Sequence, residues 1–201
     1  MQDRYKIGNA QTIGSRRVQS NYFSTRNGVS ALAVLADGTI DHINGRRCAV
    51  LAVEACMREM SYGLSGMQPR PDFDSLVMKV LAEMRGYIYS GKMPYLSLSI
   101  LFIREKELFY YTAGSNEVFL FDGRDYQFLG GRSGRLFFGG GMTAGVLSAG
   151  VKQALQETEL VSYLMKKGHP FDKAQQMVQG VLDKDRRGAG NATVLLVEDA
   201  L

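Results

Sequence analysis

An almost continuous apolar run at residues 29–35 constrains the fold of this chain more than any other stretch. A strand covered on one face alternates apolar and polar residues, whereas this run is interrupted only by Ser30. The pattern therefore predicts a central strand that is covered on both faces. The run leads into Asp37 and Gly38, and the helical spacing of apolar residues begins at Cys48. The chain thus turns from a buried strand into a helix close to a carboxylate.

The turn itself, residues 36–49, suits a bound ion or phosphate. Gly38 and Gly45 let the backbone come close to a ligand, and Asp37 places a carboxylate at the strand end. Asn44 fits the position of a helix cap. The alternative is a plain strand-to-helix loop with an exposed acid, and the spacing alone fits both interpretations.

The rest of the chain switches between strand-like and helix-like periods. At residues 95–103, Leu98 and Ile100 face one way, whereas Ser97 and Ser99 face the other, which indicates a strand. Further strands are predicted at residues 6–12, 21–25, 108–111, 117–121, 126–129 and 192–197. Helices are predicted from residue 44 to about 60, and at 73–90, 157–167 and 172–184.

Two other features have less specific patterns. The glycine-rich segment 130–145 lacks the GxxxxGK[ST] pattern of a phosphate loop, so it is predicted to be a mobile connection rather than a ligand cradle. His169 lies at a break between two predicted helices. It is predicted to cap a helix or lie on the surface rather than to act as a catalyst.

Length and composition predict one domain covering residues 1–201, large enough for a sizeable core. No run approaches the roughly 20 apolar residues of a membrane span, and residues 1–6 contain no apolar signal region. Cys48 and Cys56 fall in one predicted helix and are expected to be buried thiols rather than a disulfide. These features predict a cytoplasmic protein that does not bind membranes.

The charge pattern argues against nucleic-acid binding. The net charge is +4, and the basic pairs are scattered along the chain rather than clustered. These pairs are Arg16-Arg17, Arg46-Arg47, Lys166-Lys167 and Arg186-Arg187. A solvated surface is the better interpretation.

The order of elements predicts the architecture. Strands and a helix pair come first, followed by an antiparallel meander, more helices and a final strand. This order fits an α+β fold, an α/β/β/α sandwich of two packed antiparallel sheets with helices outside. The strand at 29–35 should be central, and the helices from residues 44 and 73 should share one outer face.

Five separated segments support this architecture: residues 16–23, 36–45, 114–117, 148–151 and 188–193. In their order and residues they resemble the motifs of the PPM (type 2C) Ser/Thr protein phosphatases. The metal loop of bacterial members reads Ala-Asp-Gly-Met-Gly-Gly-His, followed two residues later by Gly. The matching residues here are Ala36, Asp37, Gly38, His42 and Gly45.

The resemblance implies a sandwich fold and a two-metal site. In the family's phosphatases, two Mg²⁺ or Mn²⁺ ions are bridged by the acid at position 37, and the carbonyl at position 38 assists one ion. Acids at positions 149 and 190 hold the other ion, and a bridging water is the nucleophile. Arg16 matches the family's phosphate-binding arginine.

Most of the family's acids are replaced in this chain. Asn21, Ser115, Ala149 and Gly190 stand where the family has Asp, which leaves Asp37 as the only matching carboxylate. Asp41 is a less favoured substitute, because it replaces a glycine in a tight turn. We expect no catalytic residue, weak residual metal binding at Asp37 and Gly38, and no cofactor unless Mn²⁺ or Mg²⁺ supports some remaining activity.

Alternatives remain open for both matched site residues. Asp37 could instead be retained for hydrogen bonds to the amides that follow it, and this interpretation is preferred in so depleted a site. Arg16 could be a surface arginine in a local ion pair.

Three functions are compatible with the sequence. The first is a pseudophosphatase that binds a phosphoprotein or a Ser/Thr kinase in bacterial Ser/Thr phosphorylation signalling. The second is an active Mn²⁺- or Mg²⁺-dependent phosphoprotein phosphatase with an atypical, depleted metal site. The third is a non-catalytic oligomeric or structural module.

Overall fold

Two antiparallel sheets pack face to face in the computed structural model, which describes residues 4–38, 43–65, 70–91, 95–184 and 187–199. In spatial order, sheet 1 contains β1 (Tyr5–Thr12), β10 (Ala192–Asp199), β9 (Thr143–Leu147), β6 (Glu117–Phe121) and β7 (Tyr126–Phe128). Sheet 2 contains β2 (Asn21–Arg26), β3 (Ser30–Asp37), β4 (Ser97–Arg104), β5 (Glu107–Ala113) and β8 (Ser133–Phe137).

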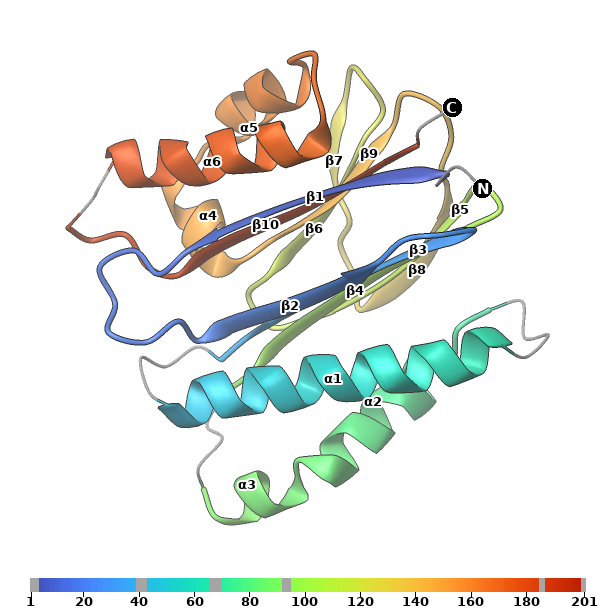
Figure 1. Cartoon of the computed structure of the whole chain (residues 1–201), viewed down its shortest axis with the longest axis vertical. Coiled ribbons are helices and arrows are strands. Elements are labelled where there is room, and N and C mark those ends of the chain that lie inside the picture. The colour runs from blue at the N-terminus through green and yellow to red at the C-terminus, as the bar shows by residue number, and fades with distance from the viewer. Residues whose placement is uncertain (1–3, 39–42, 66–69, 92–94, 185–186, 200–201) are drawn as a thin grey trace.

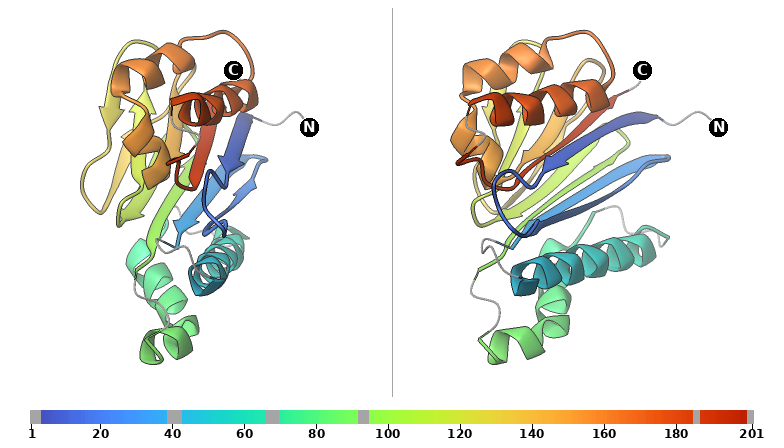
Figure 2. Two further views of the ribbon diagram at one scale, coloured as in Figure 1. Left: turned by 90° about the vertical axis from the view of Figure 1, so that its left-hand side faces the viewer. Right: turned by 60° about the vertical axis from the view of Figure 1, so that its left-hand side comes forward.

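Helices cover both outer faces of this sandwich (Figures 1 and 2). Sheet 2 is covered by α1 (Ile43–Ser65) and α2 (Phe73–Glu83), and α3 (Arg85–Tyr89) follows α2. Sheet 1 is covered by α4 (Ala149–Ala154), α5 (Glu157–Leu164) and α6 (Pro170–Lys184). The predicted α/β/β/α sandwich is therefore confirmed, as is the shared outer face of the two helices that begin near residues 44 and 73.

The central strand is β3, which pairs with β2 on one side and β4 on the other. Every residue of β3 after Ser30 is buried, as a strand covered on both faces should be. The strand runs to Asp37, two residues beyond the predicted end. It excludes Val29, whose side chain is 70% exposed.

Three apolar layers hold the sandwich together. One lies between α1, α2 and sheet 2 and includes Val53, Val80 and Ile100. The second fills the space between the sheets and includes Leu35, and the third, which includes Leu196, lies between sheet 1 and its helices. The middle layer changes in composition at one end, where polar side chains replace apolar ones.

Two sequence predictions are wrong in detail. The helix expected over residues 73–90 is divided at the buried Met84, whose ψ of 0° lies outside the regular helical value. The segment 130–145, expected to be a mobile connection, contains the edge strand β8 and the start of β9. Gly134 allows β8 to approach β5, because a Cβ there would lie 2.5 Å from the Tyr110 ring. Because glycine is uncommon in strands, the sequence pattern did not reveal β8.

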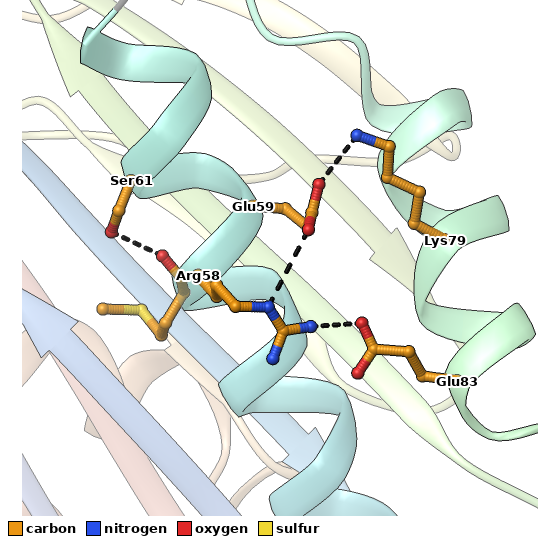
Figure 3. Close-up of polar contacts among 6 residues, drawn as sticks. Arg58, Glu59, Ser61, Lys79 and Glu83 are labelled. Atoms are coloured by element: carbon orange, nitrogen blue, oxygen red, sulfur yellow. Dashed lines mark hydrogen bonds and ion pairs between the residues drawn. The ribbon is translucent and has the colours of Figure 1, made fainter.

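Ion pairs fix α2 against α1 at the surface (Figure 3). Lys79 Nζ lies 2.7 Å from Glu59 Oε2, and Arg58 contacts both Glu83 and Glu59. Exposed pairs of this kind contribute little stability. They mark the side of α2 that faces α1, whose packing rests on buried apolar residues such as Val77 and Val80.

Candidate functional site

The apolar layer between the sheets becomes polar at the end where β2 begins and β3 ends. Inward-facing positions alternate along each strand, so the faces that carry Leu35, Leu101 and Leu195 in the core carry polar side chains here. We call this buried group the polar end; it comprises Asn21, Asp37, Ser97, Ser99, Asn116, Ser148 and Thr193. The starts of β2, β10 and α1 all lie on this side of the molecule (Figure 1, left).

On sheet 2, Asn21, Asp37 and Ser97 lie in one row across β2, β3 and β4. Asn21 is fully buried and Asp37 is 6% exposed, which excludes the exposed acid that one interpretation of the sequence allowed. The Arg46 guanidinium donates to the Asn21 backbone carbonyl and lies 4.7 Å from the centroid of the Tyr22 ring. The first turn of α1 is thereby attached to the start of β2.

Neutral hydrogen bonds connect the two sheets at the polar end. Asn21 Nδ2 donates to Thr193 Oγ1 at 3.1 Å, which joins β2 to β10. The Thr193 amide donates to Ser148 Oγ at 2.9 Å, and the Ser148 amide donates to the Thr193 carbonyl at 3.0 Å. A neutral side chain at position 21 therefore forms a cross-sheet hydrogen bond in which the amide is the donor, a role that a carboxylate could not fill.

A second connection beside it uses Asn191. Its Oδ1 accepts from the Ser20 amide at 2.8 Å and from Ser20 Oγ at 2.5 Å. Its Nδ2 donates to the Ile13 carbonyl at 2.9 Å. The β1–β2 connection is thereby attached to the segment that precedes β10.

The matched glycine at position 38 has a packing role. Gly38 is buried, and its amide donates to the Ser20 carbonyl at 3.2 Å. A Cβ on Gly38 would lie 2.3 Å from the Gly45 carbonyl oxygen, so the strand end and the start of α1 touch through their backbones. The contact between these two glycines requires no metal ion.

Ser115 follows the end of β5 and is hydrogen-bonded to β4. Its Oγ lies 3.0 Å from Ser97 Oγ, and its amide donates to Ser97 Oγ at 2.9 Å. The preceding Gly114 has a φ of 93°, and a Cβ there would lie 2.4 Å from Ser97 Oγ. The turn thus brings Ser115 to the polar end, where its hydroxyl is used for structure.

Comparison with known proteins bears on the fold. No protein-family model matches the chain, and no curated protein matches it. Solved structures do match. The serine/threonine phosphatase PstP of Mycobacterium tuberculosis has a TM-score of 0.80 at 13% identity, over 96% of this chain and 98% of that one. The chain has the fold of the PPM-type Ser/Thr phosphatases.

Two further structures agree. PppA, a regulatory component of the type VI secretion system in Pseudomonas aeruginosa, has a TM-score of 0.75 at 15% identity, over 96% of this chain and 97% of that one. The catalytic domain of PstP in complex with two manganese ions has a TM-score of 0.79 at 13% identity, over 98% and 99% of the two chains.

The side chains that the structure describes in this PPM-type fold do not by themselves supply the ligands of a two-metal centre. Two divalent cations close together need several carboxylates or other oxygen ligands to offset their repulsion. Among the residues that the structure describes, no group of three His, Cys, Asp or Glu side chains gathers at one point. Ala149 begins α4 and Gly190 precedes β10, and neither offers a side-chain ligand. Asp41 and His42 lie outside the described residues.

Buried amide atoms at the polar end lack hydrogen-bond partners. Within the described parts of the chain, Asn21 Oδ1 and both polar side-chain atoms of Asn116 have none. Such groups cost about 1–3 kcal/mol each when they stay unpaired, so a buried water or another polar group commonly satisfies them. Their neutral oxygens do not replace the charge of the missing acids.

Arg16 lies in the β1–β2 connection and is exposed. Its backbone amide donates to the Ile13 carbonyl at 3.3 Å. Among the described residues its guanidinium forms no ion pair, so the local pair considered above is not found there. Its role in binding phosphate stays a prediction, as do the roles of Asp37 and Gly38 toward a metal.

Sequence reasoning assigned no role to several residues of the site. No structural role was predicted for four of them, which appeared at most as positions in a motif: Asn116, Asn191, Ser148 and Thr193. Their signal was available, because each strand's alternation places a polar residue on the inward face at the same end. The prediction for His169 is confirmed: its Nδ1 accepts from the Phe171 amide at 3.2 Å at the start of α6.

Two further expectations concern thiols and membranes. Cys48 and Cys56 are both buried and free, as predicted. Among the described helices, none is long and apolar enough to cross a membrane.

Proposed function

We propose that this chain is a pseudophosphatase, which binds a phosphorylated protein or a Ser/Thr kinase and does not hydrolyse phosphate esters. One observation carries the proposal. At the end of the sandwich where the family's metal acids belong, the described side chains form a neutral hydrogen-bonded connection between the sheets, with Asp37 as the one acid at a matched position.

The chemistry of hydrolysis supports this proposal. A metal-bridged water is a strong nucleophile only because the ions lower its pKa, and the ions stay only where oxygen ligands hold them. The amide of Asn21 donates to Thr193, and Ser115 bonds to Ser97. These groups act as structural partners in the positions where ligands would be needed.

The similarity to PppA, which is a regulatory component in its own system, supports a signalling role. Binding without turnover would make the chain a competitor or an adaptor in a Ser/Thr phosphorylation pathway of the cytoplasm. Arg16 is the residue best suited to phosphate, because its exposed guanidinium pairs with no acid among the described residues and can form two parallel hydrogen bonds to phosphate oxygens.

The decisive test is turnover with metal present. We expect hydrolysis of p-nitrophenyl phosphate and of phosphopeptides to stay at background when Mn²⁺ or Mg²⁺ is in excess. An active phosphatase of this fold, assayed in parallel, is the positive control. Metal-dependent turnover that Asp37→Asn abolishes would establish the alternative, an active enzyme with a depleted metal site.

Binding is tested separately with pairs of phosphorylated and unphosphorylated peptides. We expect Arg16→Ala to weaken binding of the phosphorylated peptide by about tenfold. Arg124, an exposed arginine in the turn after β6, provides the matched control Arg124→Ala, which should bind like the wild type. Equal affinity of the wild type and Arg16→Ala would remove Arg16 from the proposal.

A further inference from the structure

The helix pair α2 and α3 carries a second apolar face, in addition to the buried face that packs on sheet 2. The buried face includes Phe73, Val80 and Met84. Away from the buried face, the side chains of Met78, Leu81 and Tyr89 are 66%, 39% and 81% exposed. Residues spaced by three or four positions share one face of a helix, so we call this face the outer stripe: Asp74, Met78, Leu81, Ala82, Arg85, Ile88 and Tyr89.

The outer stripe points away from the rest of the molecule. Lys79 and Glu83, which flank it on one side, reach toward α1 and bind Glu59 and Arg58 (Figure 3). The helix is therefore held with its ion-paired side toward α1 and its outer stripe toward solvent. Large contiguous apolar patches on a surface mark interaction sites, whereas single exposed apolar residues do not.

Charge placement on the outer stripe is self-complementary. Asp74 lies near the start of α2, and Arg85 begins α3, eleven positions later and just beyond the break at Met84. Both side chains are exposed, and neither forms an ion pair within the described parts of the chain. The pKa of Arg132 is raised, first by its hydrogen bond to Tyr111 and with a smaller contribution from the charge of Asp74.

We propose that the outer stripe binds a second copy of this chain in an antiparallel, two-fold symmetric dimer. A two-fold axis between Lys79 and Val80 sets Asp74 of each copy against Arg85 of the other. The same axis sets Met78 against Leu81, which places the apolar pair at the centre and the charges at both ends. A two-fold interface must be complementary to itself, and this order of charge, apolar, apolar, charge satisfies that requirement.

The size of the stripe predicts a weak dimer. One helix face gives an interface near the lower limit of specific contacts, about 1,000–1,200 Å² in total. We therefore expect a dimer that dissociates on dilution in the micromolar to hundred-micromolar range. This proposal goes beyond the proposed function and does not depend on whether the polar end binds metal.

Sedimentation velocity over about a hundredfold range of protein concentration tests the proposal. The wild type should shift from monomer toward dimer as concentration rises, and Met78→Glu should stay monomeric. Met165 provides the matched control, because it is also 66% exposed but lies after α5 on the other side of the sandwich. Met165→Glu should dimerise like the wild type.

Charge reversal distinguishes this dimer from any other self-association. Asp74→Arg or Arg85→Asp alone sets like charges together at both ends and should weaken the dimer by at least about tenfold. The double variant restores opposite charges and should regain most of the affinity. Thermal unfolding of each variant checks that α2 is intact. A wild type that is monomeric at every concentration, or a double variant as weak as the singles, would overturn the proposal.

Discussion

Asn21 and Asp37 lie directly opposite each other on β2 and β3, and both are buried. Opposed residues in an antiparallel pair have Cβ atoms about 4.5–5.5 Å apart. A second carboxylate at position 21 would therefore face the first at close range, and without a cation the two charges would repel. The amide avoids that repulsion and donates to Thr193 instead. Asn21 in place of an acid thus both removes a negative charge and supplies the hydrogen bond between the sheets.

Asn21→Asp should destabilise the protein in the absence of metal by about 2–4 kcal/mol, because it loses a buried donor and adds a like charge. The facing carboxylates would have raised pKa values in the folded state, so the folded state would bind more protons than the unfolded one. The destabilisation should therefore be small near pH 4 and grow as the pH rises to 8. Urea unfolding at several pH values measures it. Gln127→Glu, an amide-to-acid change at an exposed position, is the control and should have little effect.

Restoring the acids together should restore metal binding. Asn21→Asp, Ala149→Asp and Gly190→Asp combined should raise Mn²⁺ affinity, since Asp37 and the Gly38 carbonyl keep their positions. Position 190 has room, because a Cβ there would meet no atom within 4 Å. Mn²⁺ should raise the melting temperature of the triple variant and leave that of the wild type nearly unchanged. A large Mn²⁺-induced rise in the wild type would contradict the pseudophosphatase proposal.

The fold could be predicted because its strongest signals are local. The apolar run at residues 29–35 predicted the doubly covered strand β3, and the alternation at residues 95–103 predicted the strand β4, although β4 is buried on both faces. The edge strand β8 could not be found this way, since it is half exposed and contains Gly134. It is held by its pairing with β5, a contact between residues far apart in the sequence.

The sequence predicted which residues belong to the site better than it predicted their hydrogen-bond partners. The motif order singled out Asp37, Gly38 and Arg16. The structure places Asp37 and Gly38 at the end of β3 and Arg16 in the connection between β1 and β2. The bonds from Asn21 to Thr193 and from Asn191 to Ser20 join residues more than 170 positions apart. No local period reveals such pairs, because they depend on how the two sheets face each other.

The two thiols should be unreactive in the folded protein. Burial, with a smaller contribution from Glu83, raises the pKa of the Cys56 thiol to about 12. At pH 8 the thiolate fraction of Cys56 is then about one in ten thousand. Burial also raises the pKa of the Cys48 thiol. Labelling with a disulfide reagent at pH 8 should be slow until urea unfolds the chain, and the variant Cys48→Ser isolates Cys56. Rapid labelling of Cys56 in the folded variant would contradict its buried position.

Gly38 and Gly28 offer a matched test of why the metal-loop glycine is present. A Cβ on Gly38 would lie 2.3 Å from a backbone oxygen of Gly45, whereas a Cβ on Gly28 would meet nothing within 4 Å. Gly38→Ala should therefore force the start of α1 away from β3 and cost about 2–3 kcal/mol. Gly28→Ala should stay within about 0.5 kcal/mol of the wild type.

The measurement is urea unfolding of both variants, with and without Mn²⁺. If Gly38 serves packing, the loss should be the same in both conditions, because the clash with Gly45 does not involve an ion. A Gly38→Ala variant that is as stable as the wild type without Mn²⁺, and that only fails to gain stability when Mn²⁺ is added, would instead assign Gly38 to a working metal site. The comparison thus separates a glycine kept for close backbone contact from one kept for a ligand.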